Sequence, residues 1–201
     1  MTQPNNLKTS LINVNDCVLV IIDIQDAFLK KYEVSSAKQL VEKASWFIRL
    51  AKMMDIPTVA MAEDIEDMGT LNQDIINALP AGQTIHNKNS FGLAGDKNIL
   101  QDVKNSGRRT AILMGMETDV CVAQSALGLM AEGFNVVVLH DATATTQGDQ
   151  EIGLRRMGEA GALISSVKAT SYEWLRTVEK TIVVAISHPE FEAQLPECLA
   201  L

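Results

Sequence analysis

The chain has few cysteines, few aromatic residues and no long apolar run, and each shortage excludes a class of protein. Its three cysteines stand far apart in 201 residues without a Cys-x-x-Cys pair, which excludes a disulfide framework and a zinc knuckle. No apolar stretch reaches the roughly 18 residues of a membrane-spanning helix, so no transmembrane segment is expected. The first residues lack the basic and apolar regions of a signal peptide, so we expect a cytoplasmic protein in a reducing compartment.

The charge balance is acidic, which excludes a second class of protein. The formal net charge is -8 at pH 7, whereas general binding to a nucleic-acid backbone requires a basic face. With 47% apolar and 21% charged residues, the composition is that of an ordinary folded protein. Aromatic residues make up only 4%, which predicts a small, aliphatic pocket. We expect one domain over residues 1–201, with its core at 14–180 and a C-terminal appendage at 181–201.

Apolar runs alternate with amphipathic stretches along the chain. The predicted strands are continuous apolar runs, as burial on both faces of a parallel sheet requires: Cys17–Asp23, Pro57–Ala62, Gln83–Asn87, Thr110–Met114, Asn135–His140 and Ala162–Ser165. The predicted helices are Ser36–Met54, Asn72–Ala78, Asp96–Asn105, Asp119–Glu132, Asp149–Ala160 and Ala169–Thr177. Six strand–helix pairs predict an α/β protein with a three-layer, Rossmann-like fold, in which a six-stranded parallel sheet carries helices on both faces.

Three reactive side chains follow strands of this predicted sheet. Asp23 ends the first strand, Lys88 follows the third, and Cys121 lies in the first turn of the helix after the fourth. Ligands of open parallel sheets bind beyond the carboxyl ends of the strands, so these side chains are expected at one edge. The helix N-terminus would favour a thiolate at Cys121. Ordinary interpretations stay open, namely a loop carboxylate at Asp23, a solvated lysine at Lys88 and a small buried hydrophobe at Cys121.

Three short motifs give the sequence a resemblance to a known family. They are Asp23-Ile24-Gln25-Asp26-Ala27-Phe28, Lys88 followed by Ser90-Phe91, and Gly115-Met116-Glu117-Thr118-Asp119-Val120-Cys121-Val122. Together they resemble the signatures of the isochorismatase-like cysteine hydrolases, and the resemblance extends over residues 14–180. Within that superfamily the chain looks most similar to the isochorismatase domain-containing proteins.

The resemblance implies a Cys–Asp–Lys triad. Cys121 would attack an electrophilic carbon, Asp23 would take the thiol proton and pass it to the leaving group, and Lys88 would hold the charged pair in place. The resemblance also implies a cis peptide at Met116–Glu117 and an oxyanion hole formed by the N–H groups of Glu117 and Cys121. Thr118 is an alternative N-cap, whose hydroxyl would compete for the N–H of Cys121.

The chemistry expected from this resemblance is hydrolysis of a small amide or related C–N bond through a covalent thio-intermediate. We expect the substrate pocket to include Gln25, Phe28, Glu63 and Phe91. A metal-dependent nicotinamidase is a competing interpretation, but residues 61–67 offer carboxylates without a histidine, so no metal and no cofactor are expected. His86, two residues before Lys88, is the one histidine placed to point toward the site, and it has no partner histidine there.

A second competing interpretation is a non-catalytic binding or scaffold protein that retains the fold. Thiol reactivity separates the two, because a functional Cys121 should alkylate faster at neutral pH than Cys17 or Cys198. The partners expected of the enzyme are a small-molecule substrate and further copies of the chain as a homo-oligomer, with no nucleic acid and no membrane.

Overall fold

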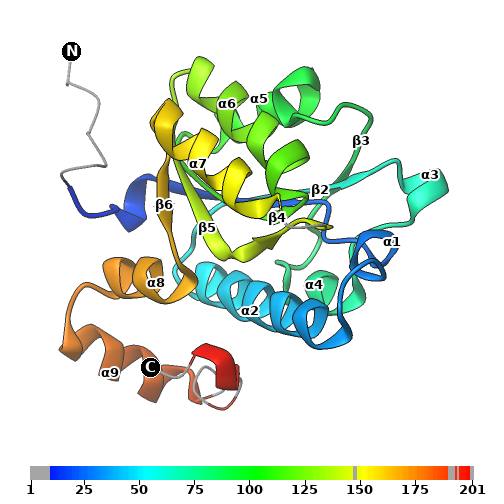
Figure 1. Cartoon of the computed structure of the whole chain (residues 1–201). Helices are drawn as coiled ribbons and strands as arrows, with labels where there is room; N and C mark the ends of the chain where they lie inside the picture. The colour runs from blue at the N-terminus through cyan, green and yellow to red at the C-terminus, as the bar shows by residue number, and fades with distance from the viewer. Residues whose placement is uncertain (1–9, 147–148, 190–192, 194, 200–201) are drawn as a thin grey trace.

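The structure, a computed structural model, describes residues 10–146, 149–189, 193 and 195–199. Its centre is a sheet of six strands in the order β3-β2-β1-β4-β5-β6, and every neighbouring pair is parallel (Figure 1). The strands are β1 (Cys17–Ile22), β2 (Thr58–Glu63), β3 (Ile85–Lys88), β4 (Thr110–Met116), β5 (Asn135–Ala144) and β6 (Leu163–Ser165). The prediction of a six-stranded parallel sheet is confirmed.

Helices cover both faces of this sheet, which confirms the three-layer arrangement. Side chains alternate along a strand, so Leu19 and Ile21 of β1 pack on one face while Val18 and Val20 pack on the other. One face carries α2 (Val34–Met53), α4 (Gln73–Ala78) and α8 (Val167–Leu175). The other carries α5 (Lys97–Asn105), α6 (Ala123–Ala131) and α7 (Gln150–Ala160). Figure 1 shows these two groups of helices on opposite sides of the strands.

The remaining elements are short and lie mostly in loops. They are η1 (Val14–Asp16), α1 (Asp26–Leu29), α3 (Ile65–Met68), η2 (Leu93–Gly95), η3 (Thr118–Val122) and η5 (Glu197–Leu199). Of these, η3 differs most from the prediction. The helix expected over Asp119–Glu132 begins there as a π-helical turn and continues as α6. Cys121 therefore lies in a π-turn, a feature found frequently at functional sites.

The carboxyl ends of β1 and β4 approach each other closely at Gly115. This residue has a φ of 139°, and a Cβ built on it would lie 1.9 Å from the carbonyl oxygen of Ile22. No other residue fits there without moving a strand. Because Asp23 directly follows Ile22, Gly115 helps to set the distance between the first strand and the segment that carries Cys121.

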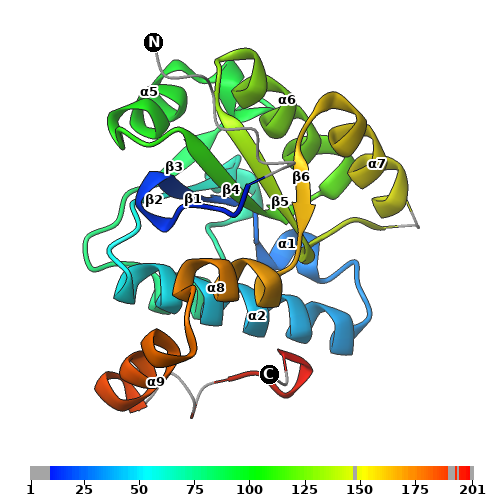
Figure 2. The same cartoon turned by 90° about the vertical axis from the view of Figure 1, so that its left-hand side faces the viewer.

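A helix beyond the last predicted one lies outside the sheet layers. The predicted helix Ala169–Thr177 is observed as α8, and α9 (Val178–Ser187) follows it, beginning three residues before the expected appendage. Figure 2 shows α9 on the outer side of α8, away from the sheet. Its exposed large apolar residues are Val178, Ile182, Val183 and Ile186. Over the described part of the chain, no helix has the length and apolar character that crossing a membrane demands.

Candidate active site

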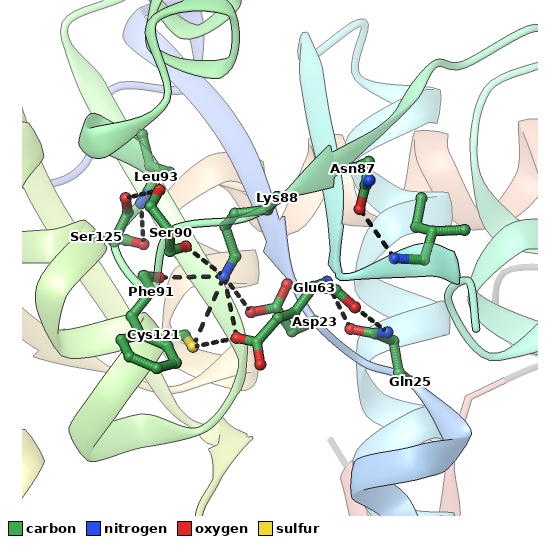
Figure 3. A network of polar contacts seen from close by, with 12 residues as sticks. Asp23, Gln25, Glu63, Asn87, Lys88, Ser90, Phe91, Leu93, Cys121 and Ser125 are labelled. Atoms are coloured by element: carbon green, nitrogen blue, oxygen red, sulfur yellow. Dashed lines mark hydrogen bonds and ion pairs between the residues drawn. The ribbon is translucent and has the colours of Figure 1, made fainter. Parts of the chain in front are cut away.

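Four neighbouring strand ends bring the predicted reactive side chains together. The strand order reverses between β1 and β4, and open α/β sheets bind ligands at such a point. Asp23 follows β1, Glu63 ends β2, Lys88 ends β3, and Cys121 follows β4. Figure 3 shows these four side chains converging on one another.

Asp23 and Lys88 form a buried ion pair. The Nζ of Lys88 lies 2.9 Å from Oδ2 of Asp23, and neither side chain is exposed. Nζ also donates hydrogen bonds to the carbonyl oxygens of Ser90, at 2.8 Å, and Phe91, at 3.2 Å. These oxygens replace the water that a buried ammonium loses, so Lys88 is not the solvated lysine of the ordinary interpretation.

The loop after β3 that supplies these carbonyl oxygens is held from two sides. The hydroxyl of Ser90 donates to the carbonyl oxygen of Gly92 at 2.9 Å. The N–H of Leu93 donates to the hydroxyl of Ser125 on α6, at 3.0 Å. α6 continues directly from the turn that carries Cys121. The hydrogen bond between Leu93 and Ser125 therefore connects the loop around Lys88 to the segment that carries the thiol.

Cys121 completes the cluster. Its Sγ lies 3.8 Å from Nζ of Lys88 and donates a hydrogen bond to Oε2 of Glu63, at 3.3 Å. Oxygens of Asp23 and Glu63 and the Sγ of Cys121 all lie within 4.8 Å of one another. The thiol is only 4% exposed. One thiol, one ammonium and two carboxylates thus share a mostly buried space.

Glu63 has a larger part in the site than the sequence suggested. It was expected only to line the pocket, yet it accepts the hydrogen bond of the thiol and lies 3.4 Å from Nζ of Lys88. The available signal was its place at the carboxyl end of a strand beside β1. The contact with Cys121 joins residues 58 positions apart and depends on the order of the strands.

Gln25 was expected to line the substrate pocket, but its side chain lies elsewhere. Its side chain is fully buried, and the amide donates to the carbonyl oxygens of Glu63, at 2.8 Å, and Gly69, at 2.6 Å. Its Oε1 accepts from the N–H of Glu63 at 2.8 Å. Gln25 therefore holds the main chain of Glu63 instead of lining the pocket, because both ends of its amide are already used.

Burial and the neighbouring charges shift the proton equilibria of the cluster. Burial raises the pKa of Asp23 to about 6, although Lys88 acts in the opposite direction. Burial would lower the pKa of Lys88, but Asp23, Cys121 and Glu63 together raise it. Burial and then Asp23 raise the pKa of Cys121 above its ordinary value, which Lys88 only partly offsets. Burial and the two carboxylates therefore act against the thiolate that the helix N-terminus was expected to favour.

Two residues of the cluster, Glu63 and Lys88, line a pocket of about 160 Å³, whose other lining residues are Asp64, Asn89, Ser90 and Phe91. Phe91 lies there as expected and is 56% exposed. Phe28 does not, because its ring packs in the hydrophobic core on the α2 side of the sheet. The pocket is small as predicted, but its lining is polar. The aliphatic prediction was wrong because loops beyond the strand ends, and not core side chains, form the walls.

The segment expected to form the oxyanion hole lies between β4 and η3. The Met116–Glu117 peptide bond is cis. The carbonyl oxygen of Glu117 accepts from the N–H groups of Val120, at 3.2 Å, and Val122, at 3.1 Å. The hydroxyl of Thr118 is buried without a hydrogen-bond partner among the described residues, so it does not compete for the N–H of Cys121. The oxyanion role of Glu117 and Cys121 stays a prediction.

Within the described ranges, one group of side chains has the ligand atoms to hold a metal ion. It consists of Asp23, Glu63 and Cys121. The Nζ of Lys88 lies within 3.8 Å of a ligand atom of each, so a metal ion would have to displace a charged ammonium. These residues therefore do not fit a metal centre as arranged. His86 adds no ligand, because its Nε2 is paired with Oδ2 of Asp102 at 2.9 Å.

Comparison with known proteins connects this geometry to a family. The sequence matches the family described as Isochorismatase domain over residues 17–169. The chain belongs to the isochorismatase domain family. Among curated relatives, isochorismatase domain-containing protein 2 from Bos taurus is 25% identical over 176 residues, which cover 87% of this chain and 79% of that protein. The resemblance drawn from the three motifs is therefore confirmed.

Solved structures of hydrolases share the fold of this isochorismatase domain protein. The YcaC gene product from Escherichia coli, described as an octameric hydrolase of unknown specificity, has a TM-score of 0.79 at 23% identity and covers 96% of both chains. N-carbamoylsarcosine amidase from Thermoplasma acidophilum has a TM-score of 0.62 at 19% identity, covering 76% of this chain and 96% of the amidase. The family and its structural neighbours support a hydrolase.

Proposed function

We propose that this isochorismatase domain protein is a cysteine hydrolase that cleaves a small amide or related C–N bond through a covalent thio-intermediate. The observation that carries the proposal is the position of Lys88 Nζ, 2.9 Å from Asp23 and 3.8 Å from the thiol of Cys121. A nucleophile, a base and a cation in one partly closed site are the groups that acyl transfer requires. The amidase that shares the fold supports a C–N bond as the target.

In the first half of the proposed reaction, the thiol proton leaves its resting partner Glu63 and moves to Asp23, whose carboxylate lies within 4.8 Å of Sγ. Sγ of Cys121 bonds to the carbonyl carbon in the same step. With a pKa of about 6, Asp23 takes up and releases protons near neutral pH, as a general base must. The C–N bond then breaks, and the proton on Asp23 passes to the nitrogen. Ammonia or an amine leaves, and a thioester on Cys121 remains.

In the second half, water adds to the thioester carbon while Asp23 takes one of its protons. The C–S bond breaks, the proton returns to sulfur, and a carboxylic acid leaves. Lys88 holds the carboxylate of Asp23 in place throughout, and the N–H groups of Glu117 and Cys121 are assigned to the oxyanion of both tetrahedral intermediates. Burial and the two carboxylates raise the pKa of the resting thiol, so proton transfer accompanies the attack.

Ammonia release from a panel of small primary amides and ureido compounds tests this proposal. The wild-type protein should hydrolyse at least one compound, and Cys121→Ser and Asp23→Asn should each lose about 10²-fold or more in rate. Cys17→Ser is the matched control, because that buried thiol lies in β1 away from the cluster, and it should retain activity. Full turnover by Cys121→Ser would refute the covalent mechanism.

The proposed enzyme is further expected to act as an assembly of identical copies in a reducing, cytoplasmic setting that keeps Cys121 free. An octameric hydrolase shares its fold. We assign the exposed apolar side of α9 to contact with a second copy. The four residues Val178, Ile182, Val183 and Ile186 are 53–78% exposed on one short helix, which is unfavourable in an isolated protein.

A further inference from the structure

Glu63 is the member of the cluster that faces the pocket opening. Its side chain is 21% exposed, whereas those of Asp23 and Lys88 are fully buried. Gln25 fixes the main chain of Glu63 through two hydrogen bonds of 2.8 Å, so the carboxylate is held at the entrance. Cys121 does not itself line this pocket, and the link between the two is Glu63, which lines the pocket and contacts the thiol. A molecule that passes from the pocket to Cys121 therefore passes beside a carboxylate.

The charges around the pocket are unbalanced. Lys88 is the sole cation among the lining residues, and its Nζ is already engaged by Asp23 and by two carbonyl oxygens. Glu63 and Asp64 both line the opening. The buried ammonium of Lys88 thus has two carboxylates against it, those of Asp23 and Glu63, and Asp64 adds a third at the pocket. An incoming anion would meet a net negative environment in which repulsion is poorly screened.

We propose that Glu63 selects the substrate by charge, so that this site accepts neutral or cationic compounds rich in N–H groups and excludes carboxylates. The inference rests on the proposed function, and it narrows the substrate class to amide, ureido, amidine or amino-substituted amide compounds. Acidic substrates, including dicarboxylic acids, are excluded.

The position of Glu63 beside the thiol also lets it orient the substrate. Its Oε2 lies 3.3 Å from Sγ of Cys121, so an N–H group that donates to this oxygen is placed beside the nucleophile. A primary amide can donate from its nitrogen to Glu63 while its carbonyl carbon faces the sulfur. A carboxylate offers only acceptor atoms at that position and leaves Glu63 without a partner.

Iodoacetamide and iodoacetate test this inference, because they differ only in the replacement of an amide by a carboxylate. The rate of alkylation at Cys121 is measured by peptide mapping for both reagents, and their ratio is divided by the ratio for free glutathione. The wild-type protein should prefer iodoacetamide by at least about tenfold, and Glu63→Gln should reduce that preference several-fold. Glu66→Gln, an exposed acidic residue on α3, is the matched control and should keep the wild-type ratio.

A wild-type ratio equal to that of glutathione, or an unchanged ratio in Glu63→Gln, would overturn the inference while Cys121 still reacts. Asp64→Asn provides a second variant at the same opening, and it should lower the ratio in the same direction. Failure of both reagents to label Cys121 would instead refute the nucleophile of the proposed function and with it this inference.

Discussion

The ammonium of Lys88 and the carboxylate of Asp23 lie 2.9 Å apart, and both side chains are fully buried. The pair joins the end of β3 to the end of β1 across β2, so it ties the site to the centre of the sheet. A buried pair of this kind is costly to break, because the partner that remains is a charge without solvent. The same two residues therefore matter for stability and for the proposed chemistry.

Lys88→Ala should lower the free energy of unfolding by about 3–5 kcal/mol at neutral pH, because Asp23 is left buried and unpaired. The loss should be smaller near pH 5, where Asp23 can bind a proton. Urea unfolding followed by circular dichroism measures both values. Lys104→Ala is the matched control, because Lys104 pairs with Glu132 with both side chains about 40% exposed, and its loss should stay below about 1 kcal/mol.

The raised pKa of Asp23 predicts a particular pH dependence of stability. The folded protein binds this proton with a pKa of about 6, against 3.8 for the free side chain. Protonation therefore stabilises the folded state below about pH 4, and this contribution is lost as the pH rises through about 6. The free energy of unfolding of Asp23→Asn relative to wild type should rise by about 3 kcal/mol across that window. A difference that stays constant with pH would contradict the assignment.

Gly115→Ala should disrupt the site through the sheet. The added Cβ would overlap the carbonyl oxygen of Ile22, and the φ of 139° is unfavourable for alanine. We expect a loss of at least about 2–3 kcal/mol in the free energy of unfolding and a matching loss of activity. Gly158→Ala on α7, where a Cβ meets only Ile164 at 3.5 Å, should be neutral or slightly stabilising. Equal effects of the two changes would rule out this role of Gly115.

Self-association through α9 is open to a direct test. Ile186→Asp places a charge on its exposed apolar side and should lower the molar mass seen by size-exclusion chromatography with light scattering. Val34→Asp, an equally exposed apolar residue at the start of α2, is the control and should leave the mass unchanged. An assembly of the same mass in both variants would place the interface elsewhere.

Local patterns were sufficient to predict the layers of the fold and the meeting of three residues at one edge. The continuous apolar run of β1 marks a strand buried on both faces, and parallel strands necessarily end at a shared edge. Asp23, Lys88 and Cys121 stand at or just after such ends, so the predicted sheet places them at one edge, while the order of the strands decides which of them touch. The side chain of Cys198, by contrast, lies outside the described residues.

Features that depend on contacts between distant segments could not be predicted from the sequence. The pKa of the Cys121 thiol depends on burial and on carboxylates from β1 and β2, whereas the local pattern shows only a helix N-terminus. The amide of Gln25 was expected in the pocket, but it is hydrogen-bonded to the main chain of Glu63. Phe28 was misplaced because the short helix α1 turns its ring into the core.

The most direct test of the account is the site of alkylation by brief, substoichiometric iodoacetamide near pH 7, located by peptide mapping. Burial raises the pKa of both thiols, so their pKa values do not separate them. Only Cys121 shares its site with the carboxylates of Asp23 and Glu63, so label should concentrate on Cys121. The rate at Cys121 should fall about 10²-fold in Asp23→Asn. Labelling of Cys121 no faster than of Cys17, or unaffected by Asp23→Asn, would contradict the assignment of these residues as a nucleophile and its base.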